Sequence, residues 1–145
     1  MIRFFCVMLC VSLMGVQAKS DDNVLSRPQF QYKHVYKEHV RTRKPMIVVL
    51  GAEWCGPCRK YKKKVWKDFA EDIVDGKSDY LLAIVDIDKD PVTKIAMLGD
   101  GEDTIPYTAV FYFKNGVSMK TSFYKLRSED YVEDQLEAID RDRDK

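Results

Sequence analysis

Cys55 and Cys58 are the residues of this chain whose type and spacing most directly suggest chemistry. They stand in the stretch Trp-Cys-Gly-Pro-Cys, and two cysteines at this spacing can form a catalytic dithiol, half of a metal site or a structural disulfide. A disulfide that closes so small a loop restrains the unfolded chain little, so stabilisation is a poor reason to have one. The spacing therefore favours redox chemistry, provided that a metal site can be set aside.

Residues 1–18 have the pattern of a secretory signal peptide. Arg3 is the single early charge, an apolar run follows it, and the small residue Ala18 precedes a polar segment. The run is short for a bilayer span, and no second apolar run of about 20 residues follows; a retained membrane anchor is the alternative interpretation. Cleavage after Ala18 would remove Cys6 and Cys10. We therefore expect an exported protein, in a periplasm, a secretory lumen or the extracellular space, whose contact with a membrane is through the signal peptide alone.

The mature chain would keep two cysteines, which argues against a metal site. Zinc needs about four ligands, and neither a second cysteine pair nor a paired histidine accompanies Cys55 and Cys58. His34 and His39 are five residues apart, a spacing that splays two side chains on a helix, so we interpret them as surface histidines. No metal is predicted, and an exported domain with one close cysteine pair points to a redox role.

Charge and length limit the possible partners of the protein and its number of domains. Without Arg3, the 24 basic residues become 23, which equals the 23 acidic residues, and no aromatic and basic stripe is present, so nucleic acid is not an expected partner. The 145 residues fit one domain. We predict a flexible leader over residues 19–29, a single domain over 30–140 and a disordered tail over 141–145.

The cysteines fall where a strand meets a helix. Met46–Leu50 is an apolar run typical of a strand buried on both faces, and the segment after Cys58 has apolar residues at helical spacing. The basic run from Arg59 to Lys67 lies on the rest of that helix. We interpret this run as the solvated face of the helix; the alternative is a surface that attracts acidic partners. Before the strand, a short charged helix with Val35 and Val40 as its apolar contacts should end near Pro45.

The remaining elements continue the alternation of strands and helices. Tyr80–Ile87 is a second apolar strand, and Asp90 can cap the helix that follows it. Thr108–Phe113 and a returning strand flank Asn115-Gly116, the strongest short hairpin signal, and Ser128 can cap a last helix. The pattern predicts an α/β fold with parallel pairing of the first two strands.

This order, with Trp-Cys-Gly-Pro-Cys at the first strand-to-helix junction, resembles the thioredoxin superfamily. Three stretches support the resemblance: AEWCGPC at 52–58, TIPY at 104–107 and FKNG at 113–116. The chain looks especially like exported thioredoxin-like thiol-disulfide oxidoreductases. The resemblance covers roughly residues 30 to 140, and it implies a single-domain thioredoxin fold with a central mixed β-sheet flanked by helices.

Exchange chemistry needs a thiolate at neutral pH, and Cys55 is expected at a helix N-terminus, which favours negative charge. Cys55 is thus the predicted nucleophile, and Cys58, more buried one turn later, the resolving cysteine. Pro57 is expected to fix the first helical turn, and Gly56 to leave the attacking sulfur uncovered. Trp54 is expected to shield the site and shape its docking surface, with core filling as the alternative.

Ile105-Pro106 resembles the family's cis-proline loop, which lies against the dithiol and pairs with the substrate backbone. An ordinary trans-proline at the start of a strand is the alternative interpretation. The resemblance therefore implies that Ile105 and Pro106 bind substrate.

The chain also departs from the family pattern. The family's buried aspartate and its lysine partner match Val49 and Ile84, so the usual proton acceptor of the second cysteine is missing. Glu53 is nearer but is expected to face solvent, so proton transfer would run through water. The loop over 99–104 is a few residues longer, and the glycine after the hairpin is replaced near 124–125. Both changes would alter the rim on which substrates dock.

The predicted function is that of an exported thiol-disulfide oxidoreductase, of the protein-disulfide reductase type, that works through a mixed disulfide. No cofactor is predicted, because the chain has no Gly-x-Gly-x-x-Gly fingerprint, so electrons must come from a thiol protein, a membrane thiol relay or a small thiol. The expected substrates are disulfide-containing proteins. A binding module in which the dithiol is incidental is the alternative, and an electron donor to a peroxidase or a methionine sulfoxide reductase is a third possibility.

Overall fold

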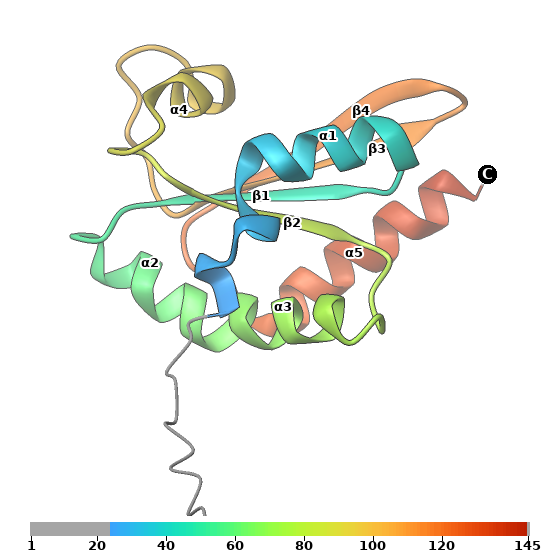
Figure 1. The fold of residues 1–145 in the computed structure, drawn as a ribbon, viewed down its shortest axis with the longest axis horizontal. Coiled ribbons are helices and arrows are strands. Elements are labelled where there is room, and N and C mark those ends of the chain that lie inside the picture. The colour runs from blue at the N-terminus through green and yellow to red at the C-terminus, as the bar shows by residue number, and fades with distance from the viewer. Residues whose placement is uncertain (1–23, 145) are drawn as a thin grey trace, which may run out of the picture.

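The centre of the fold is a four-stranded mixed sheet in the order β2-β1-β3-β4 (Figure 1). The computed structural model describes residues 24–144, so the predicted signal peptide and the first part of the leader lie outside the described residues. β1 pairs in parallel with β2 and antiparallel with β3, and β3 pairs antiparallel with β4. The strands are β1 (Met46–Gly51), β2 (Leu81–Asp86), β3 (Tyr107–Lys114) and β4 (Val117–Tyr124). The predicted α/β class and mixed sheet are confirmed.

Helices cover both faces of this sheet (Figure 1). One face carries α1 (Tyr32–Thr42) and α4 (Pro91–Leu98). The other face carries α5 (Glu129–Arg143) and a long helical segment made of α2 (Gly56–Tyr61), the π-helical turn η3 (Lys62–Trp66) and α3 (Lys67–Val74). The arrangement places the start of α2 directly after the carboxyl end of β1.

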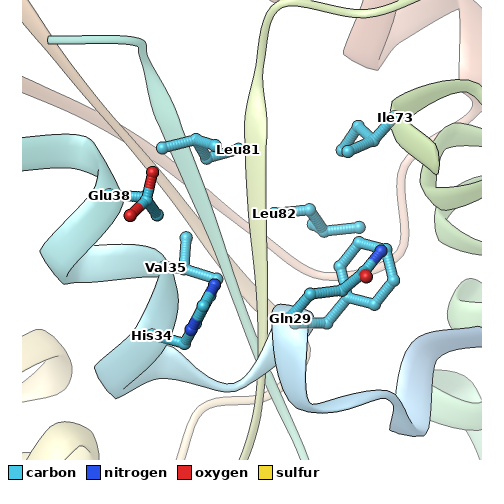
Figure 2. Close-up of a pocket in the computed structure, with 8 residues that line it drawn as sticks. Gln29, His34, Val35, Glu38, Ile73, Leu81 and Leu82 are labelled. Carbon is cyan, nitrogen blue, oxygen red and sulfur yellow. The ribbon is translucent and has the colours of Figure 1, made fainter. Parts of the chain in front are cut away.

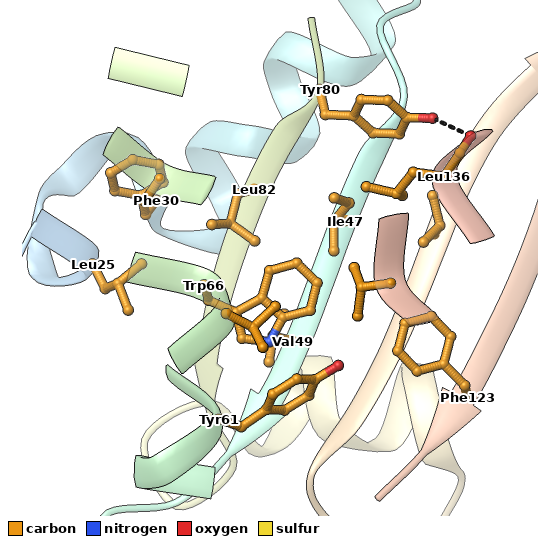
Figure 3. Close-up of a cluster of buried hydrophobic side chains, with 14 of the residues drawn as sticks. Leu25, Phe30, Ile47, Val49, Tyr61, Trp66, Tyr80, Leu82, Phe123 and Leu136 are labelled. Carbon is orange, nitrogen blue, oxygen red and sulfur yellow. Dashed lines mark hydrogen bonds between the residues drawn. The ribbon is translucent and has the colours of Figure 1, made fainter. Parts of the chain in front are cut away.

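The buried side chains form two clusters, one on each face of the sheet. The larger cluster packs beneath α2, α3 and α5 and includes Tyr61 and Trp66 (Figure 3). Within it, the Tyr80 hydroxyl donates a hydrogen bond to the Leu136 carbonyl at 3.0 Å, which ties β2 to α5. The second cluster contains Cys55 and Cys58 together with side chains of α1 and α4. Both cysteines are therefore part of a packed core and not of a loose surface loop.

The predicted turn and cap signals are confirmed. The Asp90 carboxylate accepts the backbone N–H of Thr93 at 2.9 Å, and the Ser128 hydroxyl accepts that of Tyr131 at 3.3 Å. Asn115 and Gly116 connect β3 and β4 with φ angles of 51° and 79°. Two positive φ values in succession are the requirement of the hairpin turn that Asn-Gly favours.

Both ends of the domain are more ordered than the sequence suggested. Val24 and Leu25 lie in a short 3₁₀ turn and are buried in the larger cluster, so the predicted flexible leader is wrong for this part. Phe30, at the end of a second turn, is 2% exposed. At the other end, the predicted disordered tail begins at residue 141, but α5 continues to Arg143. The prediction is therefore wrong for residues 141–143. An ion pair of 3.0 Å between Arg143 and Asp140 supports the last turn.

Helix α1 buries a different residue from the one predicted. Val35 is 2% exposed as expected, but Val40 is 47% exposed and His39 is 3% exposed. His39 is four residues after Val35 and shares its face of the helix. Its ring stacks on Phe113 with a centroid distance of 4.9 Å, and its Nδ1 atom lies 2.7 Å from the Lys44 carbonyl oxygen. The interpretation of His39 as a surface histidine is wrong, whereas His34 is exposed.

The helical segment after Cys58 is interrupted by the π-helical turn η3, in which the Lys67 N–H donates to the Lys62 carbonyl. A single π turn of this kind is often found at functional sites. The basic residues from Arg59 to Lys67 are exposed except for Lys62, which is only partly exposed. The predicted solvated face is therefore confirmed for the other basic residues and wrong for Lys62.

Among the helices of residues 24–144, none has the length and apolar character that a membrane span needs.

Candidate active site

Cys55 and Cys58 form a disulfide at the junction between β1 and α2, with their Cα atoms 5.2 Å apart. Cys55 is 6% exposed and Cys58 is 1% exposed. Cys55 is thus the more exposed residue of the pair, and Cys58 is the more buried one. Gly56 and Pro57, which separate the two cysteines, are exposed on the outer side of the pair.

Cys55 is the N-cap residue of α2. Its backbone is extended, with φ −80° and ψ 102°, and its Sγ atom accepts the backbone N–H of Cys58 at 3.2 Å. Pro57 lies in the first turn, where its missing N–H costs no helical hydrogen bond. Free backbone N–H groups and the helix dipole favour negative charge on an atom in this position. The geometry therefore favours the thiolate form of Cys55 when the pair is reduced.

Gly51, the last residue of β1, leaves room for Cys58. A Cβ atom on Gly51 would lie 3.1 Å from the Cys58 Cβ, 3.4 Å from the Cys58 Sγ and 3.9 Å from the Lys62 Cε. A contact of 3.1 Å with a Cβ atom on a neighbouring helix is too close to be accommodated without movement. The close packing of α2 on the end of β1 thus favours glycine at this position, which no sequence motif marked.

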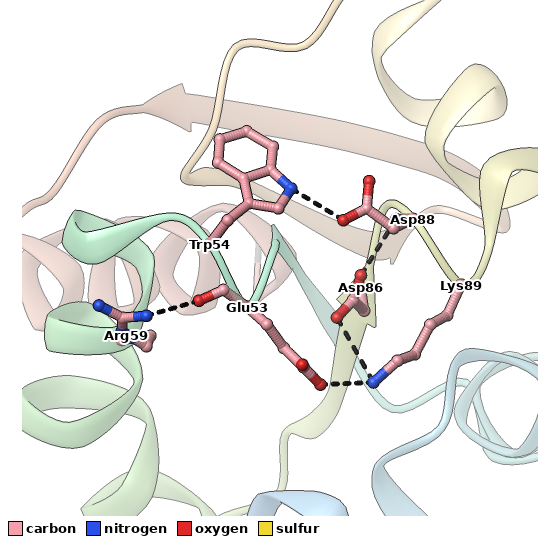
Figure 4. Close-up of polar contacts among 6 residues, drawn as sticks. All are labelled: Glu53, Trp54, Arg59, Asp86, Asp88 and Lys89. Atoms are coloured by element: carbon pink, nitrogen blue, oxygen red, sulfur yellow. Dashed lines mark hydrogen bonds and ion pairs between the residues drawn. The ribbon is translucent and has the colours of Figure 1, made fainter.

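Trp54 flanks the disulfide and is 64% exposed, so the core-filling alternative is wrong. Its indole Nε1–H donates to the Asp88 carboxylate at 2.8 Å (Figure 4). Asp88 follows the carboxyl end of β2, and the carboxyl ends of parallel strands lie at the same edge of a sheet. The acidic run after the second predicted strand could therefore have indicated its position beside the cysteines.

Glu53 faces solvent, as expected, and is held by an ion pair. Its carboxylate lies 2.5 Å from the Lys89 Nζ, which is also 3.8 Å from the Asp86 carboxylate (Figure 4). The hydrogen bond from Lys89 lowers the pKa of Glu53. The Arg59 guanidinium donates to the Glu53 carbonyl at 2.7 Å and fixes the backbone of the junction. Glu53 therefore belongs to the polar rim of the site.

Ile105 and Pro106 form the loop that leads into β3. The Ile105–Pro106 peptide bond is cis, as expected. Ile105 is partly buried against the cluster that contains both cysteines, and Pro106 is buried. The Pro106 carbonyl accepts the Lys125 N–H at 2.8 Å, and Lys125 has a φ of 70°. The residue after the hairpin thus takes a left-handed backbone conformation and connects β4 to this loop.

The positions of the two missing family residues carry apolar side chains, which lie in or against the larger cluster. Val49 and Ile84 are register partners in β1 and β2, and Val49 is 2% exposed. Thr108 is the partner of Val49 in β3. Burial raises the pKa of the nearby Tyr61 hydroxyl to about 12, so it stays protonated at neutral pH. Neither Val49 nor Tyr61 can take a proton from Cys58 at neutral pH.

A cavity of about 180 Å³ lies away from the disulfide, between α1, α3 and β2 (Figure 2). Its walls are mostly apolar, and Gln29, His34 and Glu38 contribute its polar groups. Neither cysteine lines this cavity. Within residues 24–144, no group of three or more His, Cys, Asp or Glu residues is arranged to hold a metal ion.

Comparison with known proteins assigns the family. A family model described as thioredoxin-like matches residues 27–111, more than half of the chain. The chain belongs to the thioredoxin-like family. The match includes the dithiol and the cis-proline loop of this thioredoxin-like protein, and it ends within β3.

Solved structures agree on the fold of this thioredoxin-like protein. The thioredoxin of Trichomonas vaginalis is 18% identical with a TM-score of 0.58, and the alignment covers 75% of this chain and 91% of that one. A thioredoxin from Thermus thermophilus is 14% identical with a TM-score of 0.59, covering 76% and 84%. A search of the curated proteins found no significant match. The fold together with the Cys55–Cys58 pair indicates an oxidoreductase.

Proposed function

We propose that this protein is an exported thiol-disulfide oxidoreductase that reduces or exchanges disulfides of other proteins. The observation that carries the proposal is the position of the Cys55 sulfur, which caps α2, accepts the Cys58 N–H at 3.2 Å and belongs to the more exposed residue of the pair. A sulfur at this position is favoured as an anion.

The proposed reaction starts from the reduced dithiol. The Cys55 thiolate attacks one sulfur of a substrate disulfide, the substrate S–S bond breaks, and the other substrate sulfur leaves as a thiolate that takes a proton from water. The Cys58 thiolate then attacks the Cys55 sulfur and releases the second substrate thiol. The products are a substrate dithiol and the Cys55–Cys58 disulfide, which is the form in this structure. Two electrons pass to the substrate in each cycle.

The surface around the disulfide supports a protein substrate. Trp54, next to Cys55, is 64% exposed, and Ile105 packs against the cluster that contains both cysteines, at the start of β3. We infer that a substrate backbone lies against this loop as an added strand, in the manner of sheet augmentation. Regeneration of the dithiol requires an external thiol, and we propose a thiol protein or a membrane thiol relay for this step.

Reduction of insulin disulfides by the full chain, with dithiothreitol as the electron source, tests the enzymatic role. We expect catalysis that is lost in Cys55→Ser and a stable mixed disulfide with substrate in Cys58→Ser. Equal inactivity of the wild-type chain and Cys55→Ser would instead support the alternative of a binding module.

Export is proposed from the sequence of residues 1–18. Expression of the full chain in a secreting host, followed by N-terminal sequencing of the product, tests it. We expect a product that starts at Lys19 and is found outside the cytosol. An intact N-terminus on a cytosolic product would contradict export without affecting the redox chemistry.

A further inference from the structure

The resolving cysteine has an unusual neighbour. Cys58 and Lys62 are four residues apart and therefore lie on the same face of the helical segment. The Cys58 Sγ and the Lys62 Cε lie 3.4 Å and 3.9 Å from the same point, the position that a Cβ atom on Gly51 would occupy. The distance between the Cys58 Sγ and the Lys62 Cε therefore cannot exceed the sum of their distances from this point. The space that glycine leaves at the end of β1 is shared by the sulfur and the lysine side chain.

Lys62 differs from the other lysines of its helical segment. It is partly buried, whereas Lys60, Lys63 and Lys64 are exposed. The π turn begins at Lys62, directly after the turn that carries Cys58. Three charged groups from outside the segment influence Lys62: Asp86 at the end of β2, Glu53 after β1, and Lys89, which pairs with both carboxylates (Figure 4). Burial lowers the pKa of Lys62, and Asp86 and Glu53 oppose that change and favour the ammonium form.

Cys58 itself needs help to ionise. It is 1% exposed, and burial in apolar surroundings raises the pKa of a thiol. Val49, at the position of the family's buried acid, provides no carboxylate, and Glu53 is held at the rim by Lys89. The cation that lies on the same helix face, one turn along, is Lys62. A positive charge on the side chain that shares this partly buried space favours a thiolate.

We propose that the Lys62 ammonium stabilises the Cys58 thiolate and so promotes the resolving step, in place of the buried acid that this chain lacks. The inference rests on the proposed function. In that step the Cys58 thiolate forms a bond to the Cys55 sulfur, the bond between Cys55 and the substrate breaks, and the electron pair leaves on the substrate sulfur, which takes a proton from solvent. Lys62 forms and breaks no covalent bond and keeps its proton throughout.

The direct test is the ionisation of Cys58 in the reduced full chain. The ¹³Cβ shift of labelled cysteine is followed against pH in a Cys55→Ser background, and the Cys58 signal is assigned by its loss in Cys58→Ser. We expect Lys62→Met to raise the pKa of Cys58 by about one unit, equivalent to about tenfold less thiolate at neutral pH. Lys62→Arg should keep the wild-type titration, because it keeps the charge. Lys63→Met, an exposed neighbour, should leave the titration unchanged.

The second test is kinetic. Release of substrate from a preformed mixed disulfide at Cys55 is measured against pH, with Cys58 intact. Lys62→Met should move the rise of this rate to higher pH by the same amount and slow release about tenfold near neutral pH. An unchanged Cys58 titration in Lys62→Met, an equal shift in Lys63→Met, or an Arg variant that behaves like Met would overturn the proposal. The titration needs no turnover, so a lack of insulin reduction would count against the proposed function and not against the role of Lys62.

Discussion

Two strand-to-helix junctions lie side by side in this fold and share one helix-capping pattern. The cysteine junction (residues 51–58) leads from β1 to α2, and the aspartate junction (residues 86–93) leads from β2 to α4. Their first residues, Gly51 and Asp86, are register partners. In both, the fifth residue caps the helix and accepts the backbone N–H of the eighth, at 3.2 Å in the cysteine junction and 2.9 Å in the aspartate junction.

The difference between the junctions lies in the capping atom. Asp90 presents carboxylate oxygens, which accept from the N–H of Thr93 and also from its hydroxyl at 2.6 Å. Cys55 presents sulfur, a weaker acceptor, and its partner Cys58 contributes a second sulfur. An oxygen cap stabilises the helix and does no more, whereas a sulfur at the same place gives up hydrogen-bond strength and gains the ability to form and exchange a covalent bond. The same helix terminus thus supports stability in one case and redox chemistry in the other.

The largest expected effect comes from giving the cysteine junction an oxygen cap. Serine is a good N-cap residue, so Cys55→Ser should keep the fold of the reduced protein while insulin reduction falls to the rate without protein. Asp90→Ser should keep both fold and insulin reduction. Circular dichroism and the reduction assay on both variants check the pair. Loss of insulin reduction in Asp90→Ser at intact fold would show that the two junctions are not functionally separate.

The close approach of α2 to β1 gives the second effect. Gly51→Ala would place a Cβ atom 3.1 Å from the Cys58 Cβ, and overpacking of this kind costs about 1–3 kcal/mol. Chemical denaturation of the reduced chain measures the loss. Gly56→Ala is the matched control, because no atom lies within 4 Å of a Cβ there, and it should change the free energy of unfolding by less than about 0.5 kcal/mol. Equal destabilisation by the two variants would contradict the packing argument.

The parts of the fold that the sequence predicted well are those with local rules. The aspartate cap, the serine cap and the Asn115-Gly116 turn depend on neighbouring residues only, and all three are present. The strands of the sheet centre are apolar runs, which burial on both faces requires. The dithiol at the end of β1 followed from the position of the motif between a strand and a helix.

The parts that the sequence did not predict depend on distant contacts. His39 is buried because Phe113, from the hairpin, stacks on it. Val24 and Leu25 are buried because the larger cluster offers them an apolar surface. Lys62 is partly buried because Gly51 leaves space beside Cys58. His39 and Lys62 occupy the buried faces of their helices, but both side chains are polar, so hydrophobic patterning assigned them to the surface; Val24 and Leu25 stand in a polar segment and were assigned to a flexible leader.

The aspartate cap should contribute a moderate amount of stability. Asp90→Ala leaves the Thr93 N–H without its acceptor and should lower the free energy of unfolding by about 1 kcal/mol. Asp90→Asn keeps an oxygen at the same position and should lie close to wild type, since asparagine caps as well as aspartate. Thermal unfolding of both variants in the reduced state provides the measurement. An alanine variant as stable as wild type would mean that the Asp90 cap does not contribute to the free energy of unfolding.

The smallest effect concerns the ion pair that connects the junctions, Glu53 to Lys89. Lys89 lowers the pKa of Glu53, so the pair contributes stability above the ordinary glutamate pKa of 4.5, and this is lost as pH falls through the lowered value. Lys89→Met should raise the pKa of Glu53 towards 4.5, and the side-chain carboxyl ¹³C shift against pH measures it. Lys94→Met, which removes the partner of Asp103, should leave Glu53 unchanged.

Both groups of this ion pair are exposed, so the change in stability should be small even where the change in pKa is clear. A Glu53 pKa that does not move in Lys89→Met would contradict the ion pair in solution. The junctions would then still be joined by the backbone hydrogen bond from Ile87 to Gly51 and by the hydrogen bond from Trp54 to Asp88, which links the residue before the nucleophile to the loop after β2.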